Sequence, residues 1–380
     1  MSSPLDKGRV KICILTSAHP PFDGRIFHKE AKTLAKAGYN VVLIGQHTRE
    51  ETVDGVRIVP LPEPRNRFER MTKVVWKLFR LALKEKANVY HFHDPELMPV
   101  GLILKFFGKK VIYDVHEDYE QKMLSKSWIR DGFRKPVSFF VGSMEKISGM
   151  FFDYIITADS RTKMKFKKNK VDVVANFAPL GFAEGVEADE KEGAFKVIYA
   201  GVISEDRGAI KIFETIEYLK HEDIEFHLLG KVNVPRLIDL FNSTPRIKYH
   251  GVVPWEEVSK YLVNADVGLI LLQPVPAYTY CPGENVIKLF EYMSVGLPII
   301  ISNFPKLKSM ISEIGCGVSV DPTAPKEIAD SIEFLYRNPD LRKQMGENGR
   351  KAILEKYNWE REGRKLLEVY CRILDSTQNE

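Results

Sequence analysis

Short apolar runs alternate with amphipathic helical stretches along this chain, and the alternation starts twice. The first series opens with the buried-type run Val10–Leu15 and the amphipathic stretch Arg25–Ala37. The second series opens with Val197–Ala200. Further strands are expected at residues 40–44, 56–59, 89–92, 110–113, 154–157 and 171–174 and, in the second series, at 225–229, 247–249, 267–271, 299–301 and 317–320. Such alternation predicts parallel sheets that helices cover on both faces.

The segment between the two series, residues 176–195, has the composition of a linker, with a Pro, three Gly and an acidic run. At 380 residues the chain is also too long for one ordinary core. We therefore expect an α/β fold of two doubly wound, Rossmann-like domains, residues 1–180 and 181–358, which face each other across a cleft. A final amphipathic helix, Trp359–Leu374 in the segment 359–380, could pack on either domain, and so could cross back to the first.

Composition excludes several classes of protein. The apolar content of 44% and the well-spread charge are typical of a soluble globular protein. No apolar run reaches the length of about 18 residues that spans a bilayer, and the apolar stretch near the start is too short for a signal peptide. The four cysteines show no metal-ligand or redox spacing and fit reduced thiols in the cytosol. They are Cys13, Cys281, Cys316 and Cys371.

Positive charge is concentrated in the first half of the chain. The net charge is +5, of which residues 1–180 carry about +12 and the remainder about −7. The segments 73–86 and 161–170 are strongly basic. They form either two solvated helix faces or a surface that meets anionic lipid headgroups or an acidic acceptor, because clustered Lys and Arg attract anions. No aromatic-interleaved motif supports nucleic-acid binding. We expect a cytoplasmic protein that can associate peripherally with the inner face of a membrane.

The stretch Gly283–Pro298, GENVIKLFEYMSVGLP, carries the strongest functional signal. A polar lead-in opens a helix on which Lys288 and Glu291 lie three residues apart and can point the same way. A carboxylate near the start of a helix that follows a strand is well placed to hold a sugar hydroxyl, and the amides of a helix start can bind a phosphate. The combination indicates a nucleotide-sugar site.

Two other loops that follow predicted strands could approach a phosphate. In the segment 199–212, Arg207 and Gly208 lie where the helix amides begin, and the forked guanidinium suits a diphosphate. The segment 16–25 lacks G-x-G-x-x-G, which argues against a nicotinamide enzyme. There, Gly24 either permits close approach of a phosphate or sugar or simply completes a tight loop.

Histidines and carboxylates follow two strands of the first series. His91 and His93 would share one face of a strand, and Asp94 follows them. With no third ligand fixed nearby they make a weak metal site, so we expect a hydrogen-bonding loop and no metal. We place His93 and Asp94 on the acceptor side.

The second of these loops, residues 114–120, holds one histidine among four carboxylates. His116 could orient a substrate hydroxyl or stabilise developing charge there, unless the loop is an ordinary solvated acidic one. It is the favoured functional histidine of the nine in the chain. Glu117 joins the expected acceptor side.

Together these residues resemble the retaining GT-B glycosyltransferases of family 4, also called glycosyl transferases group 1, over most of the chain. The most specific parts are Asn285–Pro298 and the loop 201–208. In that family an E-x7-E motif spans the later helix, and its second Glu contacts the nucleotide ribose. Glu291 matches this position and is followed by the family-like run Tyr-Met-x-x-Gly-Leu-Pro. By the same resemblance Gly24 matches a glycine near the donor phosphates, and His116 matches a histidine near the sugar.

The first Glu of that motif is replaced in this chain. The position is Gly283, and Glu284 stands one place late. Because the first Glu contacts the donor sugar in the family, either Glu284 or the amides near Asn285 and Val286 are expected to carry that contact.

A second departure lies in the loop that holds the diphosphate. The family places an Arg and a Lys five residues apart there, and this chain has Val202 and Arg207. Lys288 could compensate for the missing cation. Both departures bear on the donor more than on the fold.

The resemblance implies transfer of a hexose from a nucleotide diphosphate sugar to a hydroxyl acceptor with retention, as in the synthesis of cell-surface polysaccharide or glycolipid, without a cofactor. The first domain would bind a glycan or lipid-linked acceptor and the second the donor. His116, Arg207 and Lys288 form the expected catalytic set, since a diphosphate leaving group needs cations. A nucleotide-sugar 2-epimerase of the same architecture and a non-catalytic relative that binds sugar nucleotides are the alternatives.

Overall fold

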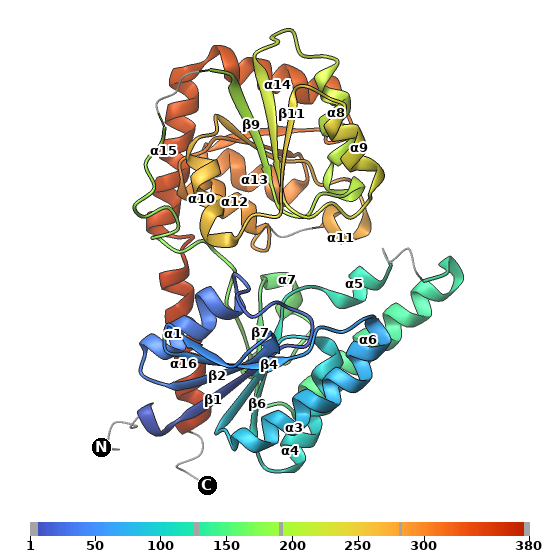
Figure 1. Ribbon diagram of the computed structural model, residues 1–380, viewed down its shortest axis with the longest axis vertical. Helices are drawn as coiled ribbons and strands as arrows, with labels where there is room; N and C mark the ends of the chain where they lie inside the picture. The colour runs from blue at the N-terminus through green and yellow to red at the C-terminus, as the bar shows by residue number, and fades with distance from the viewer. Residues whose placement is uncertain (1–6, 125–128, 190–192, 281–282, 376–380) are drawn as a thin grey trace. The chain divides into compact units, whose positions relative to one another are not determined.

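The computed structural model describes residues 7–124, 129–189, 193–280 and 283–375. Cys281 therefore lies outside the described residues. The chain divides into two compact units, each with its own parallel sheet and core (Figure 1). Unit 1 comprises Met1–Asn176 together with Arg361–Glu380, and unit 2 comprises Phe177–Glu360. The predicted α/β fold of two Rossmann-like domains is confirmed.

The sheet of unit 1 has eight strands in the order β3-β4-β2-β1-β5-β6-β7-β8. The strands are β1 (Lys11–Leu15), β2 (Asn40–Gln46), β3 (Glu51–Val53), β4 (Val56–Leu61), β5 (Val89–Phe92), β6 (Lys110–Val115), β7 (Tyr154–Thr157) and β8 (Val171–Val173). All neighbours are parallel except β3 and β4. The short strand β3 was not predicted. It forms a hairpin through Asp54 and Gly55, whose φ angles of 49° and 79° suit a two-residue Asp-Gly turn.

Helices cover both faces of this sheet. They are η1 (Lys7–Arg9), η2 (Ile26–Ala31), α1 (Lys32–Lys36), α2 (Arg67–Glu69), η3 (Arg70–Val74), α3 (Val75–Glu85), η4 (Pro95–Leu97), α4 (Met98–Phe106), α5 (Tyr119–Leu124), α6 (Asp131–Phe151), α7 (Ser160–Lys163), η5 (Lys168–Lys170) and α16 (Trp359–Asp375). Helices α3, α4 and α6 lie on one side of the sheet, and α1 and α16 lie on the other (Figure 1). The predicted helix Arg25–Ala37 begins as a π-helix, in which the Glu30 amide donates to the Arg25 carbonyl at 2.9 Å.

The two faces of β5 differ in chemistry. Tyr90 and Phe92 pack into the apolar core with Leu78 of α3 and Leu104 of α4, all fully buried. His91 points to the opposite face, where α16 contacts it. Side chains alternate across a strand, so one short strand supplies the core on one face and polar groups on the other.

The sheet of unit 2 has six parallel strands in the order β11-β10-β9-β12-β13-β14. They are β9 (Phe195–Ala200), β10 (Ile224–Leu229), β11 (Ile247–Gly251), β12 (Val267–Ile270), β13 (Ile299–Ser302) and β14 (Gly317–Val320). The helices are η6 (Glu205–Arg207), α8 (Ala209–Ile216), α9 (Arg236–Asn242), α10 (Trp255–Val263), α11 (Pro276–Thr279), α12 (Ile287–Ser294), α13 (Pro305–Ile314), α14 (Pro325–Arg337) and α15 (Pro339–Glu355).

Each sheet reverses its winding at one point. In unit 1 the chain moves outward from β1 to β2 and later from β5 to β6, so the reversal lies between β1 and β5. In unit 2 it lies between β9 and β12. Ligands of open α/β sheets bind beyond the carboxyl ends of the strands at such a point.

The last helix, α16, belongs to unit 1. Leu366 and Tyr370 are fully buried, and the Glu362 carboxylate accepts a hydrogen bond from the Ala175 amide at 2.8 Å. Among the described residues, no helix is both long and apolar enough to cross a membrane.

Candidate functional site

In unit 1 the predicted polar residues gather beyond the ends of β1, β5 and β6. Asp94, two residues after β5, accepts hydrogen bonds from the Thr16 hydroxyl at 2.8 Å and the Ser17 amide at 2.7 Å. Thr16 and Ser17 directly follow β1, so Asp94 ties the two loops together at the reversal of the sheet. Asp94 is almost fully buried, which suits a group that holds loops in place.

His93 and His116 are hydrogen bonded to each other. The His93 Nδ1 and His116 Nε2 atoms lie 2.9 Å apart. His93 is fully buried, whereas 14% of the His116 side chain is exposed, so His116 is the member of the pair that reaches the surface. Burial lowers the pKa of His116 to about 4, although Asp114 acts in the opposite direction. His116 is therefore neutral at pH 7 and offers one donor and one acceptor.

A third histidine at this edge, His19, was not singled out from the sequence. Its Nδ1 lies 3.4 Å from an Asp23 oxygen, and its ring centroid lies 5.5 Å from that of His116. Burial alone would lower the pKa of His19, but the hydrogen bond with Asp23 and the charge of Asp94 raise it to about 9. His19 is thus a cation beside a neutral histidine. Its position in the loop after the first strand was the signal that could have found it.

A buried ionic cluster lies beneath His93. The Arg25 guanidinium contacts Asp114 at 2.8 Å and Glu30 at 2.8 Å, and all three side chains are buried. The Nε2 atoms of His91 and His93 lie 3.9 and 3.6 Å from a Glu30 oxygen. Burial, followed by the charge of Asp114, raises the pKa of Glu30 well above its usual value.

Among the described residues of unit 1, this cluster is the group of side chains that could hold a metal ion. One ligand atom from each of Glu30, His91, His93 and Asp114 lies within 4.8 Å of the others. Arg25 already supplies positive charge to both carboxylates, and the Tyr370 hydroxyl lies 2.9 Å from His91 Nδ1. The cluster is therefore balanced in charge by the chain's own residues. Arg25, Glu30 and Tyr370 were not identified from the sequence, because they come from distant elements.

The other two predicted residues of unit 1 lie in the neighbouring loops. Gly24 is in the turn before η2, and the next two amides, of Arg25 and Ile26, donate to the Asp23 carboxylate at 2.8 and 2.9 Å. Those amides are thus already bonded within the protein. Glu117 forms an ion pair with Lys122.

In unit 2 the predicted cation Lys288 is half-buried, and its ammonium nitrogen is fully buried without a hydrogen-bond partner among the described residues. Its ammonium lies 3.7 Å from the centroid of the Tyr199 ring, and no hydrogen bond to its Nζ is formed within the described residues. At Gly201, where φ is +129°, a Cβ atom would lie 3.0 Å from Nζ. Burial and the charge of Arg207 lower the pKa of Lys288 well below its usual value, and Glu291 opposes them. A buried ammonium with unused donors is a site prepared for an anion.

Arg207 lies at the same edge, at the end of η6. Its Nε donates to the Tyr278 hydroxyl at 3.3 Å, and this hydroxyl donates to Asp206 at 3.1 Å. The η6 turn follows β9, where the winding of the sheet reverses. Arg207 and Lys288 are near enough for one charge to lower the pKa of the other, so the structure brings the two predicted cations together.

Glu291 is buried on α12, one turn after Lys288. One Glu291 oxygen accepts a hydrogen bond from the Trp255 indole at 2.9 Å, and the residue is 7% exposed. The predicted helix 285–298 is shorter in the structure, because α12 spans Ile287–Ser294. Trp255, like Tyr199 and Tyr278, was not identified from the sequence.

The segment before α12 shows why Gly283 replaces a glutamate. Gly283 has φ of +88°, and a Cβ there would lie 3.2 Å from the Met310 methyl. A side chain at this position would therefore be strained. Glu284 and Asn285 are half-buried and Val286 is buried just before the first turn of α12. Val202 is the other position at which this chain differs from the family pattern. Its carbonyl accepts a hydrogen bond from the Tyr199 hydroxyl at 2.7 Å.

Known proteins resemble this chain over most of its length. Residues 185–352 match the family described as Glycosyl transferases group 1, and residues 24–182 match Glycosyltransferase Family 4. An uncharacterized glycosyltransferase of Methanocaldococcus jannaschii is 23% identical over 95% of this chain and 98% of its own length. The capsular polysaccharide biosynthesis glycosyltransferase CapM of Staphylococcus aureus is 20% identical over 88% of this chain and 89% of its own length.

A solved structure has the same fold. Anabaena HepE in complex with UDP-glucose aligns with a TM-score of 0.71 at 11% identity, covering 96% of this chain and 100% of that one. The two family matches together cover both units. The chain belongs to family 4 of the glycosyltransferases, the glycosyl transferases group 1, and has the GT-B fold.

Proposed function

We propose that this protein transfers a hexose from a nucleotide diphosphate sugar to a hydroxyl group of a glycan or lipid-linked acceptor, with retention of the anomeric configuration. The observation that carries the proposal is the buried ammonium of Lys288, which lies beside Arg207 and has no hydrogen-bond partner among the described residues. A diphosphate would supply the acceptors that the Lys288 ammonium lacks and further acceptors for the Arg207 guanidinium, and its charge would offset the repulsion between the two cations.

The donor side is assigned to unit 2. Arg207 and Lys288 would hold the diphosphate and neutralise the charge that develops on it as the sugar leaves. Glu291 would bind the ribose, since Trp255 fixes one of its oxygens and leaves the other with spare acceptor capacity. UDP is the favoured nucleotide because the structurally similar HepE was solved with UDP-glucose.

The sugar contact must differ from that of relatives with a glutamate at position 283. The positive φ of Gly283 would strain any residue with a side chain, and a Cβ there would lie 3.2 Å from the Met310 methyl. We assign the contact to Glu284 or to the backbone near Asn285 and Val286. Gly24 is assigned to the donor phosphates.

The acceptor side is assigned to unit 1. His116 is the exposed end of the hydrogen-bonded pair with His93 and would orient the sugar or the acceptor hydroxyl as a neutral group. Asp94 and His93 would act on the substrate only through His116, because both are buried. Glu117 would line the same loop. No metal is required in this mechanism, since the leaving phosphate can accept the acceptor's proton.

A role in cell-surface polysaccharide or glycolipid synthesis fits the likeness to CapM. The concentration of positive charge in residues 1–180 would then serve peripheral association with the anionic inner face of a membrane, where a lipid-linked acceptor resides.

The test combines binding and turnover. A thermal-shift screen of UDP, GDP and ADP sugars should identify the donor, since a ligand that binds the folded state raises its stability. Lys288→Ala and Arg207→Ala should each lose about 1.5–3 kcal/mol of donor binding or transition-state stabilisation. Lys260→Ala, on the exposed face of α10, is the matched control and should behave as the parent. Unchanged donor binding and turnover in both site variants would show that the assignment is wrong.

Product analysis separates the alternatives. A free epimerised nucleotide sugar, formed without acceptor, would identify a 2-epimerase. Donor binding with no turnover on any acceptor would identify a non-catalytic relative. This outcome is worth testing because the chain has Gly283 and Val202 where the family pattern has a glutamate and an arginine.

A further inference from the structure

Helix α6 has the reverse of the usual polarity. The residues on its buried side are small or polar: Ser138, Gly142, Glu145, Ser148 and Gly149. Its solvent side carries a line of large apolar residues, Phe133, Phe140, Ile147 and Phe151, which are 63%, 64%, 50% and 59% exposed. Spacings of seven, seven and four residues place these four on one face of the helix. We call them the α6 stripe.

The helix cannot turn to bury the stripe. A Cβ at Gly142 would lie 2.9 Å from Glu120, and one at Gly149 would lie 2.9 Å from Ile155. The buried Glu145 also accepts a hydrogen bond from the Tyr113 hydroxyl at 2.9 Å. The close packing of the glycines leaves no room for phenylalanines on the inner side, so the rotation of α6 is set with its aromatic face outward.

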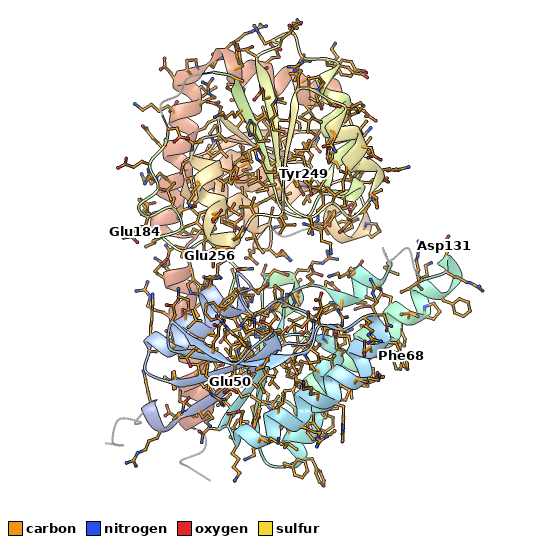
Figure 2. The ribbon with its side chains drawn as sticks, viewed as in Figure 1. Glu50, Phe68, Asp131, Glu184, Tyr249 and Glu256 are labelled. Atoms are coloured by element: carbon orange, nitrogen blue, oxygen red, sulfur yellow. The ribbon has the colours of Figure 1, made fainter. Side chains whose placement is uncertain are left out.

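Further exposed aromatic residues adjoin the carboxyl end of the stripe. Lys105 of α4 forms an ion pair with Asp153, just after α6, at 2.7 Å. This contact joins the ends of the two helices, and the next residues, Phe106 at the end of α4 and Phe107 just beyond it, are 88% and 55% exposed. The start of α6, near Asp131, extends to the edge of unit 1, and Phe68 is another exposed aromatic residue of this unit (Figure 2). Exposed aromatic side chains that gather on one face of a helix are typical of an interaction site.

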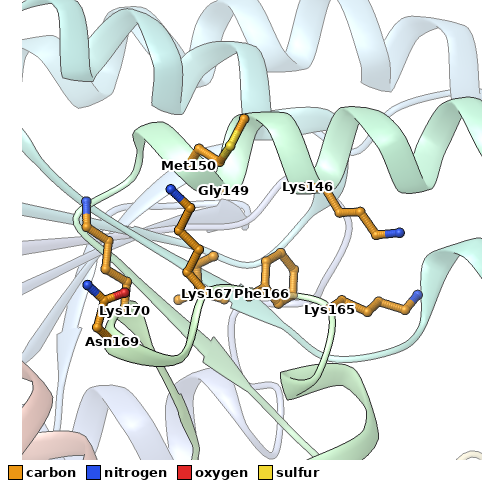
Figure 3. A pocket seen from close by; sticks show the side chains of 9 residues that line it. Lys146, Gly149, Met150, Lys165, Phe166, Lys167, Asn169 and Lys170 are labelled. Carbon is orange, nitrogen blue, oxygen red and sulfur yellow. The ribbon is translucent and has the colours of Figure 1, made fainter.

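The segment that contains α6 is strongly basic, and several of its lysines line a pocket beside the helix. Residues 130–170 contain ten Lys or Arg and four Asp or Glu, a net charge of +6. A pocket of about 250 Å³ lies against α6 and is lined by Lys146 and Met150 of the helix and by Lys165, Lys167 and Lys170 (Figure 3). Lys165 is paired with acidic residues, whereas Lys146 and Lys167 form no ion pair with any described residue.

We propose that the α6 stripe and its lysine pocket form the surface by which this protein binds an anionic phospholipid bilayer. The aromatic side chains would enter the boundary between headgroups and acyl chains, and the pocket would take a lipid phosphate. This rests on the membrane association proposed above and names its site. Charge complementarity selects the bilayer as the occupant, because a second copy would bring two surfaces of the same positive charge together.

Vesicle flotation tests the proposal. The full-length protein should bind vesicles of phosphatidylcholine with about one third phosphatidylglycerol, and bind weakly to phosphatidylcholine alone. Phe133→Ser combined with Phe140→Ser should lower the partition coefficient at least about tenfold. Lys146→Gln and Lys167→Gln should each lower it about fivefold and reduce its salt dependence. Phe334→Ser, at a residue 48% exposed in unit 2, is the matched control and should bind as the parent.

A second measurement reports insertion directly. Phe140→Trp should gain a blue-shifted fluorescence on anionic vesicles that brominated lipids quench, whereas Phe334→Trp should not. Circular dichroism and the thermal shift with UDP should match the parent in every variant, since the substituted residues are exposed and belong to no assigned nucleotide contact.

The outcomes separate the proposals. If the parent binds anionic vesicles and the Phe133 and Phe140 variant binds equally well, the surface is wrong although membrane association stands. If the parent does not bind, both membrane proposals fail while nucleotide binding can still support the glycosyltransferase assignment. A dimer in sedimentation equilibrium that Phe140→Ser dissolves would make a second copy the occupant and overturn the proposal.

Discussion

Replacing Lys288 with methionine should make the ligand-free protein more stable and its nucleotide binding weaker. The Lys288 ammonium is buried, lies against Tyr199 and lacks a hydrogen-bond partner among the described residues. Methionine has a similar shape and carries no charge. The substitution should therefore remove an unsatisfied buried group and return about 1–3 kcal/mol of unfolding free energy.

This gain can be converted into a melting temperature. For a domain of the size of unit 2, each kcal/mol corresponds to roughly 2–4 °C, so Lys288→Met should melt about 2–12 °C above the parent. The same substitution removes a charged contact to the diphosphate, so UDP should bind about 10–150-fold more weakly. In differential scanning fluorimetry the variant should have a higher melting temperature without ligand, and UDP should raise that temperature less than it does in the parent.

The pH dependence of the unfolding free energy is an independent test of the lowered pKa of Lys288. Burial and Arg207 lower the pKa of Lys288 in the folded protein, so the unfolded chain binds more protons over the interval below the ordinary lysine pKa of 10.5. The stability of the parent should therefore rise with pH as that interval is crossed, and the stability gap between variant and parent should narrow. Lys260→Met, at an exposed site, is the control and should change neither quantity. A Lys288→Met variant that is less stable than the parent, or that keeps the full UDP response, would refute the reasoning.

Three further substitutions test particular contacts. Burial raises the pKa of Glu145 from 4.5 to about 7, against the hydrogen bond from Tyr113. The unfolding free energy of the parent should therefore fall by about 3 kcal/mol as the pH rises from 4.5 to 7. Glu145→Gln should reduce this fall, measured by urea titrations from about pH 4 to 8. Gly283→Glu restores the family's residue but should destabilise the protein by at least about 1–3 kcal/mol because φ is +88° there, and a stable variant with faster turnover would contradict this. Arg25→Met leaves Asp114 without its buried partner and should cost about 3–5 kcal/mol, measured by denaturant unfolding; a change under 1 kcal/mol would show that the pair is not important for stability.

Much of the fold was predictable because the strands are short, apolar and regularly spaced. The predicted strands of both sheets are present, and their carboxyl ends carry the loops that were expected to hold the site. Lys288 and Glu291 were predicted to share a helix face, which requires only the helical repeat. The short hairpin strand β3 was missed, since three residues give too little periodicity to detect.

The contacts between distant residues could not be read from local pattern. Tyr370 reaches His91 across 279 positions of the chain, and Tyr199 lies under Lys288 because β9 and α12 meet in the fold. The outward orientation of the aromatic face of α6 could not be predicted from helical periodicity either. A helix with one apolar stripe is normally placed with that stripe inward, and here glycines occupy the inner side instead.

The return of α16 to unit 1 has a consequence for the order in which the two units are made. The eight strands of unit 1 are synthesised before unit 2, yet the residues that complete unit 1, Arg361–Glu380, are synthesised after unit 2. Until then His91 lacks the Tyr370 hydroxyl, and the apolar surface that Leu366 covers stays open. Unit 2 is a continuous segment and can fold as soon as it emerges. Unit 1 is thus finished only after unit 2, and a nascent chain that stalls before α16 would carry a complete unit 2 on an unfinished unit 1.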